Sequence, residues 1–295
     1  MRNLTQEEQV FIEDYKQTKK DTYDKPSVTA DIVLFTIDET PAIDTRKRAK
    51  LNLQVLLVQR DTSPFKGYWS LAGSFMQTTE RLDTTVQRSL YTEVGLTDIY
   101  AEQLYTFSEV ERDPRMRVLS TAYMSLVNKK NIKTGVNDSQ LISSWFNLKL
   151  ESLSKLVSED NKISMERLEL TLYNEERNIT LKSILMLTKE RRGINVQETL
   201  EILESDLAFD HSEIIVYALQ RLRNKLGYTT LAFNLVDAEF TLPRLQEVYE
   251  TVLGKPLYKA LFRKQMEPLI EETGNTIVEG SYRPSKTYRF VGTQL

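Results

Sequence analysis

The side chains with the clearest potential for chemistry lie within residues 71–96, LAGSFMQTTERLDTTVQRSLYTEVGL. Positions 89, 92 and 93 have the spacing i, i+3 and i+4, which places them on one face of a helix. A divalent cation bound to that face would need several carboxylate oxygens. The sequence supplies Ser89, Thr92 and Glu93, so only one of the three side chains is a carboxylate. We therefore expect a helix face from which most of a metal site is missing.

Apolar spacing predicts the helix that carries these positions. Leu82, Val86 and Leu90 recur every four residues, so one stripe of the helix packs inward. Gly95 stands where helices commonly end in a left-handed residue. Before the helix, the sequence favours a strand end and a loop over residues 73–79.

Length and composition limit the classes of protein to consider. The 295 residues, 40% of them hydrophobic, suffice for two domains with ordinary cores. The absence of cysteine excludes disulfides and thiolate zinc sites, and a single histidine, His211, argues against a histidine-based triad. His211 fits a structural role better than a functional one. Neither a run of about 18 apolar residues nor an N-terminal signal is present, so we expect a cytoplasmic protein without membrane contact.

Periodicity predicts the first domain as strands around one or two helices, which implies an α/β sandwich. A helix over residues 3–20 begins with a capping box of Thr5 and Glu8. Strands are expected over residues 31–37, 51–59, 68–73, 100–109, 117–128 and 144–148. The charged segments 40–50 and 111–117 are expected as exposed turns.

Residues 162–205 admit two interpretations. Leu168, Leu170 and Leu172 alternate with polar residues, and a second alternating run follows Asn174, as in a hairpin. Helix is the alternative, because Glu, Leu and Lys are strong helix formers. We favour extra strands added to the first domain, within a β-rich insertion over residues 152–206.

The order of elements in the last third of the chain indicates a winged helix-turn-helix. Helices are expected over residues 210–226, 241–253 and 259–266, followed by a hairpin of residues 269–273 and 286–291 with a turn region at Gly274 and Asn275. A capping box of Asp210 and Glu213 begins the first helix, and Thr241 caps the second.

This last third is more basic than the rest of the chain. The net charge is −3, but residues 255–295 hold seven Lys/Arg against four Asp/Glu. In a winged helix-turn-helix, one helix enters the major groove of double-stranded DNA and nearby cations contact phosphates. The candidate DNA-binding residues are Lys255, Tyr258, Lys259, Arg263, Lys264, Arg283, Lys286 and Arg289. The alternative is a small helical domain whose basic residues are only solvated.

Residues 71–96 resemble the Nudix box, G-x5-E-x7-R-E-U-x-E-E-x-G-U, where U is a bulky aliphatic residue. The positions that agree with it are Glu80, Arg88, Leu90, Glu93, Gly95 and Leu96. Ser74 replaces the box glycine, and Ser89 and Thr92 replace two of its glutamates. The resemblance implies that the fold of the box is retained while most of its metal-binding carboxylates are missing.

Longer runs in both halves of the chain are similar to the Nudix-related transcriptional regulators of NAD metabolism. They are residues 23–37, 64–75, 112–123, 208–235 and 240–264. The resemblance implies a Nudix α/β/α sandwich over residues 1–206 and a winged helix-turn-helix over residues 207–295. It also implies a homodimeric repressor that binds palindromic operators and senses ADP-ribose or a related nucleotide.

Within that resemblance, arginines would hold a pyrophosphate through charge-assisted contacts, and an aromatic ring would cover an adenine. The candidate ligand-binding residues are Arg60, Phe65, Trp69, Arg112, Arg115 and Arg117, with Tyr68 as a further candidate ring. We expect no required cofactor and no metal.

Two other functions stay open at this point. A magnesium-dependent Nudix hydrolase of ADP-ribose-like substrates would use Glu80, Arg88 and Glu93, with a further carboxylate such as Glu109 or Glu111. A regulator that senses a sugar is the second alternative.

Overall fold

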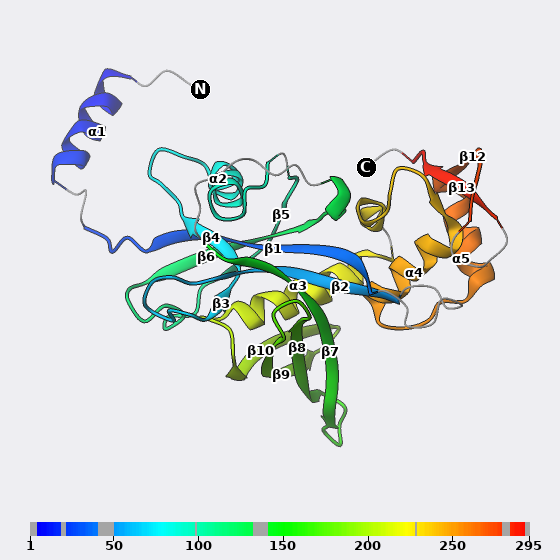
Figure 1. Ribbon diagram of the computed structural model, residues 1–295. Helices are drawn as coiled ribbons and strands as arrows, with labels where there is room; N and C mark the ends of the chain where they lie inside the picture. The colour runs from blue at the N-terminus through cyan, green and yellow to red at the C-terminus, as the bar shows by residue number, and fades with distance from the viewer. Residues whose placement is uncertain are drawn as a thin grey trace.

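Most strands of the protein join one ten-stranded sheet, in a computed structural model that describes residues 5–18, 22–40, 50–97, 99–131, 141–227, 229–278 and 284–292. The strand order is β10-β9-β8-β7-β2-β1-β6-β5, with β3 beside β2 and β4 beside β1 (Figure 1). The strands are β1 (Ser27–Thr40), β2 (Lys50–Gln59), β3 (Trp69–Ser70), β4 (Ala72–Phe75), β5 (Glu102–Phe107), β6 (Val118–Leu126), β7 (Ser143–Val157), β8 (Ile163–Asn174), β9 (Ile179–Arg192) and β10 (Asn195–Ser205).

Strand β1 lies at the centre of the first half of the chain, antiparallel to β2 and parallel to β6. Its continuous apolar run is buried on both faces, as expected of a central strand. Val33 and Phe35 belong to one hydrophobic cluster, whereas Ile32 and Leu34 belong to another on the opposite face. The predicted α/β/α sandwich is confirmed.

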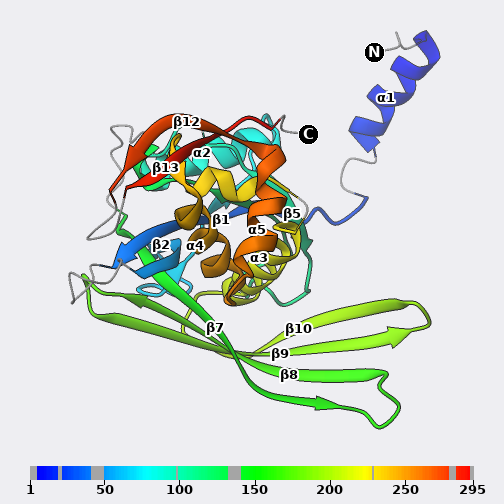
Figure 2. The same cartoon turned by 90° about the vertical axis from the view of Figure 1, so that its right-hand side faces the viewer.

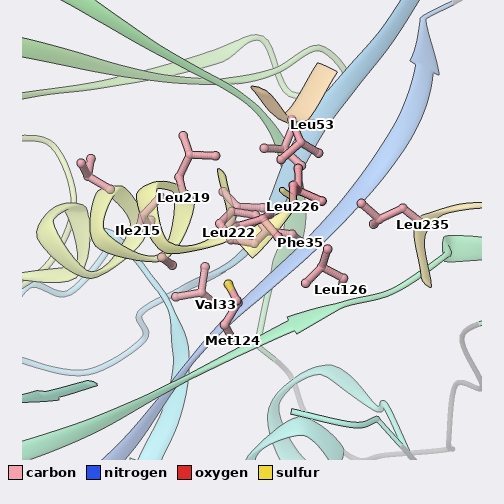
Figure 3. Packing of buried hydrophobic residues seen from close by; sticks show 14 of the residues in the cluster. Val33, Phe35, Leu53, Met124, Leu126, Ile215, Leu219, Leu222, Leu226 and Leu235 are labelled. Atoms are coloured by element: carbon pink, nitrogen blue, oxygen red, sulfur yellow. The ribbon is translucent and has the colours of Figure 1, made fainter. Parts of the chain in front are cut away.

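One helix covers each face of this region. Val86 and Leu90 of α2 (Leu82–Val94) pack with the cluster of Ile32 and Leu34. Ile215, Leu219 and Leu222 of α3 (His211–Lys225) pack with the other cluster, as Figure 3 shows. Gly95 ends α2 with φ of 71°, as the sequence predicted.

Strands β7 to β10 form a long arm that reaches away from the body of the protein (Figure 2). The predicted hairpin is confirmed in β8 and β9, and the helical alternative is wrong. Leu168, Leu170 and Leu185 point to one buried face of this sheet. Strand β7 runs to Val157, well beyond the predicted residue 148, and β10 adds a strand that the sequence analysis did not separate.

The C-terminal part contains α4 (Leu242–Leu253), α5 (Lys259–Met266) and a three-stranded sheet of β11 (Phe240–Thr241), β12 (Ile270–Ile277) and β13 (Ser285–Phe290). Three 3-10 helices complete the described elements: η1 (Lys129–Asn131), η2 (Leu231–Leu235) and η3 (Glu267–Leu269). The Thr241 hydroxyl accepts the Arg244 N–H at 3.2 Å, so the predicted cap of α4 is confirmed. Together these elements form the predicted winged helix-turn-helix.

Two local predictions in this half are wrong. Gly274 and Asn275 do not turn the chain: they lie within β12, where Gly274 has φ of 81° and the register with β13 shifts between Glu272 and Thr276. Asp210 does not cap α3 with its side chain, because its carboxylate binds Arg112 instead.

Apolar packing and ion pairs join the two halves. Leu245 and Val248 of α4 share the cluster that contains Phe35. Arg244 pairs with Glu39 at 2.7 Å, and Lys130 pairs with Asp237 at 2.7 Å. The predicted division between residues 206 and 207 stays a prediction, and α3, which follows it, packs on the sheet.

Helix α1 (Gln6–Thr18) stands apart from the body (Figures 1 and 2). Its predicted capping box is confirmed: the Thr5 N–H binds the Glu8 carboxylate at 2.8 Å, and the Glu8 N–H binds the Thr5 hydroxyl at 3.3 Å. Among the helices in the described ranges, none has the length and apolar composition of a membrane span.

Candidate functional site

A cavity of about 170 Å³ opens where β1, β2 and β4 meet the loop after β5 and the start of α3. Three parts of the chain bring charged groups to it: Arg60 directly follows β2, α2 contributes Glu93, and the loop after β5 contributes Arg112 and Arg115. The rest of the wall that matters for its chemistry is formed by Thr29, Asp31, Gly73, Phe75, Phe209 and His211. Of the predicted ligand-binding residues, the structure brings Arg60, Arg112 and Arg115 together here.

Two of these arginines flank one aromatic ring. The guanidinium carbons of Arg60 and Arg115 lie 4.8 Å and 5.8 Å from the centre of the Phe209 ring. Burial and the nearby charge of Arg115 lower the pKa of Arg60 below its ordinary value. Asp113 offsets part of the charge of Arg115 through hydrogen bonds of 3.0 and 2.8 Å. Two guanidinium groups at one wall favour an anionic ligand with planar, bidentate acceptors.

Arg112 differs from them because its side chain is only 4% exposed. Its Nε and Nη2 donate to the two carboxylate oxygens of Asp210 at 2.8 and 2.7 Å, and Asp31 lies 3.5 Å away. Burial would lower the pKa of Arg112, but the bonds to Asp210 outweigh it and hold that pKa above its ordinary value. Arg112 therefore joins the cavity wall to the first residues of α3.

Arg117 is predicted at the ligand site but does not line the cavity. Its guanidinium donates to the backbone oxygens of Ser108 and Glu109, both at 2.9 Å. It joins the end of the loop that carries Arg112 and Arg115 to the beginning of that loop.

Glu93 supplies the acidic side of the cavity. Its carboxyl group is buried, and this burial raises its pKa to about 8, with a further contribution from the charge of Asp31. The hydrogen bond from Gly73 and the charges of Arg60 and Arg88 oppose that shift. At neutral pH, Glu93 is therefore largely uncharged and does not repel an anion.

The residues that replace carboxylates in the Nudix box form hydrogen bonds to other residues of the chain. The Ser89 hydroxyl lies 2.5 Å from that of Ser74, and donates to the Thr85 carbonyl at 2.8 Å. The Thr92 hydroxyl donates to the Arg88 carbonyl at 2.8 Å. No group of three or more His, Cys, Asp or Glu is placed to share a metal ion in the part of the chain that the structure describes.

Glu80 and Arg88 keep the pairing that stabilises the loop before α2. Arg88 donates to the two Glu80 oxygens at 3.1 and 2.6 Å, and these bonds lower the pKa of Glu80 to about 2. Glu109 and Glu111, the further carboxylates considered for a hydrolase, are exposed and do not line the cavity.

The predicted aromatic residues lie elsewhere. Trp69 is 3% exposed and packs edge-on against Phe146, with ring centroids 4.8 Å apart, in the core. Phe65 and Tyr68 lie outside the cavity wall, and Phe65 packs on Phe209 at 4.8 Å. The phenyl rings in the wall are those of Phe75 and Phe209, and Phe209, which both Arg60 and Arg115 approach, was not singled out by the sequence analysis. Its only sequence signal is its place directly before Asp210 and His211, and its φ of 53° is rare for a bulky residue.

His211 lines the cavity and also makes a contact within the fold, and its predicted structural role stays a prediction. Its Nδ1 accepts the Leu71 N–H at 2.8 Å, and burial lowers its pKa below the ordinary value. The neutral imidazole therefore ties the start of α3 to the strand that holds Gly73.

The candidate DNA-binding residues gather around α5. Phe262 and Met266 anchor this helix inward, so Lys259, Arg263 and Lys264 are exposed. A groove of about 750 Å³ between α5 and β13 is lined by Arg263, Lys264 and Lys286.

The other candidates differ in their surroundings. Lys255 and Tyr258 precede α5, with Tyr258 78% exposed. Lys286 and Arg289 are paired with Glu272 and Glu271. Arg283 lies outside the described residues.

Comparison with protein-family models matches residues 41–168 to the NUDIX domain and residues 232–290 to the NrtR DNA-binding winged helix domain. Over 287 residues the chain is 29% identical to the ADPR responsive transcriptional repressor NtrR of Acinetobacter baylyi, which covers 96% of this chain and 88% of the relative. Over 123 residues it is 30% identical to ADP-ribose pyrophosphatase of Methanocaldococcus jannaschii, which covers 42% of this chain and 70% of the relative.

Solved structures agree with this arrangement over nearly the whole chain. A MutT/nudix family protein from Enterococcus faecalis superposes with a TM-score of 0.64 and 25% identity, covering 98% of this chain and all of the other. Shewanella oneidensis NrtR complexed with a 27mer DNA superposes with a TM-score of 0.56 and 26% identity, covering 90% of this chain and 93% of the other. The chain belongs to the Nudix-related regulators, in which a Nudix domain is followed by an NrtR-type winged helix domain.

Proposed function

We propose that this protein is a transcriptional repressor whose Nudix cavity binds ADP-ribose or a closely related nucleotide and thereby changes DNA binding. The observation that carries the proposal is the pair of guanidinium groups, Arg60 and Arg115, beside the largely uncharged Glu93. A pyrophosphate presents the planar oxygen pairs that such groups bind. Support comes from the Acinetobacter relative, which is described as an ADPR-responsive repressor.

The box residues favour a sensor over a hydrolase. Nudix-type hydrolysis uses divalent ions to polarise phosphate and activate water. Ser89 and Thr92 offer hydroxyls that already donate to backbone carbonyls, and Glu93 is the one carboxylate among the three positions. These residues do not fit Mg²⁺, so we propose that the ligand is held without being cleaved and that no cofactor is required.

The winged helix would read double-stranded DNA through α5. The exposed cations of α5 and the groove beside β13 suit a helix in the major groove with a hairpin against the phosphates. We propose that the protein acts as a homodimer on a palindromic operator, because two copies related by a two-fold axis read two half-sites. Such a regulator would work in the cytoplasm, beside the chromosome.

The test combines DNA binding and ligand binding on the full-length protein. Fluorescence anisotropy with labelled promoter DNA from the neighbourhood of its own gene should show binding at low salt and a change in affinity with ADP-ribose. Calorimetry should show that ADP-ribose binds, whereas free ribose, which lacks the pyrophosphate, should not. Failure to bind any such DNA would refute the proposal.

A separate hydrolysis assay tests the alternative function, because one relative of this chain is an ADP-ribose pyrophosphatase. The wild type and Glu93→Gln are incubated with ADP-ribose and Mg²⁺, and the products AMP and ribose phosphate are measured. Turnover that Glu93→Gln abolishes would show that the protein is a hydrolase.

A further inference from the structure

Helix α3 connects the cavity to the winged helix. Its first residue, His211, lines the cavity, and its second half reaches α4 (Figure 1). Fifteen residues at about 1.5 Å per residue give a length of roughly 22 Å. Along that length Ile214, Ile215 and Leu219 are fully buried. A close-packed helix of this kind transmits strain along its length, because a densely packed interior is hard to compress.

At the cavity end, the helix is fastened through Asp210. This residue precedes α3 directly, and its carboxylate takes both hydrogen bonds from Arg112. Arg112 also lines the cavity, and Asp210 occupies two of its donors, Nε and Nη2. An anion in the cavity and the carboxylate of Asp210 would therefore compete for the same guanidinium.

At the far end, the helix is fastened through Arg223. Its Nε donates to the Val252 carbonyl in the last turn of α4 at 2.9 Å. A Cβ at Gly254, the residue that ends α4, would lie 3.2 Å from an Arg223 nitrogen. The guanidinium thus sits at the C-terminus of α4, where a cation is favourable. Four residues separate Gly254 from α5, which begins at Lys259.

We infer that Arg112 is the positioning residue through which ligand binding reaches the DNA-binding half, by exchanging Asp210 for an anionic group of the ligand. Loss of this pair frees the start of α3, and the helix transmits the change to α4 and α5 through Arg223. Two alternative partners for one buried guanidinium provide the two states that such coupling requires. This inference rests on the proposed function.

The test measures the response ratio, the Kd for operator DNA with saturating ADP-ribose divided by the Kd without it. For the wild type we expect the two Kd values to differ by a factor of at least about five, as is common for allosteric coupling. Asp210→Asn keeps the shape of the residue but removes the charge that competes for Arg112. We expect it to bind ADP-ribose more tightly and to bring the ratio within about twofold of one.

Asp113→Asn is the matched control. Asp113 also forms a two-point pair with a cavity arginine, Arg115, but it lies in the loop and its carboxylate does not directly precede α3 as that of Asp210 does. We expect it to tighten ADP-ribose binding while the response ratio stays that of the wild type. A full response in Asp210→Asn, or an equal loss in both variants, would overturn the inference.

Arg223→Met tests the far end and serves if Asp210→Asn does not fold. It keeps the aliphatic stem and removes the donor to Val252, so ADP-ribose affinity should stay unchanged while the response ratio moves toward one. A wild-type response in this variant would also overturn the inference. A wild-type ratio of one in the unmodified protein would instead refute the proposed function.

Discussion

Both carboxyl oxygens of Glu93 accept hydrogen bonds from the backbone N–H of Gly73, at 3.3 and 3.1 Å. This contact fixes α2 against β4 at the cavity. A side chain at position 73 would collide with the carboxylate of Asp31 and the backbone of Ala30, so the close packing of β4 on β1 requires glycine. The one acid that remains on this helix face is thus held in place by backbone, in a setting that favours its neutral form.

The raised pKa of Glu93 predicts a pH-dependent stability difference. The folded pKa is about 8, against the ordinary 4.5, so this group stabilises the fold fully below about pH 4.5 and loses that contribution as the pH rises through 8. Glu93→Gln should therefore gain stability relative to the wild type across that interval, by up to about 4 kcal/mol. Urea denaturation at pH 4.5, 6 and 8.5 measures the difference. A stability difference that does not change with pH would contradict this assignment of the raised pKa to Glu93. The pKa of Glu213 is also raised, to about 7, but its effect on stability cancels in the comparison because both proteins contain it.

The same titration should affect ligand binding. Above pH 8, ionised Glu93 would place a negative charge beside the proposed pyrophosphate. We expect ADP-ribose affinity to fall on the order of tenfold between pH 7 and pH 9. Calorimetry at both pH values should show the fall in the wild type and none in Glu93→Gln. An equal fall in the two proteins would assign it to another group.

Arg60 and Arg115 should both contribute to ADP-ribose binding. Arg60→Ala and Arg115→Ala each remove a charge-assisted contact, which should weaken binding about 10- to 100-fold. Arg192→Ala, at an exposed ion pair on β9, is the control and should bind ADP-ribose as the wild type does. If Arg60→Ala and Arg115→Ala also bound it as the wild type does, the proposed ligand wall would be misplaced.

Arg263 on α5 should contribute to DNA binding without supporting the fold. Within the described ranges it is exposed and makes no ion pair. Arg263→Ala should weaken operator binding about tenfold and reduce the slope of log affinity against log salt by about one if it contacts a phosphate. Arg192→Ala, at an exposed ion pair on the arm, is the control and should bind DNA as the wild type does. An unchanged affinity in Arg263→Ala would show that α5 is not the recognition helix.

Local features of the fold followed from the sequence because local rules decide them. Apolar spacing located α2, and Gly95 ended it in the predicted left-handed conformation. Alternation over residues 162–205 placed β8 and β9, because one face of that sheet packs on the core. Thr241 capped α4 as its position required.

Long-range pairings could not be predicted in the same way. Asp210 looked like a helix cap, yet Arg112, 98 residues earlier in the chain, occupies its carboxylate. Phe209 showed no periodic pattern because its place in the cavity depends on a positive φ and on where α3 begins. Gly274 suggested a turn, but the hairpin extends beyond it because the chain accommodates this glycine as a bulge.

The packing of α3 has a consequence for protein engineering. A chimaera that transplants the winged helix onto another sensor would be joined near the boundary predicted at residue 207, and would take α3 with it. The transplanted helix would then carry Ile214, Ile215 and Leu219 into solvent, because their binding surface is the sheet that was left behind. We expect such fusions to aggregate, and expect that functional exchange between these proteins requires α3 to travel with its sheet.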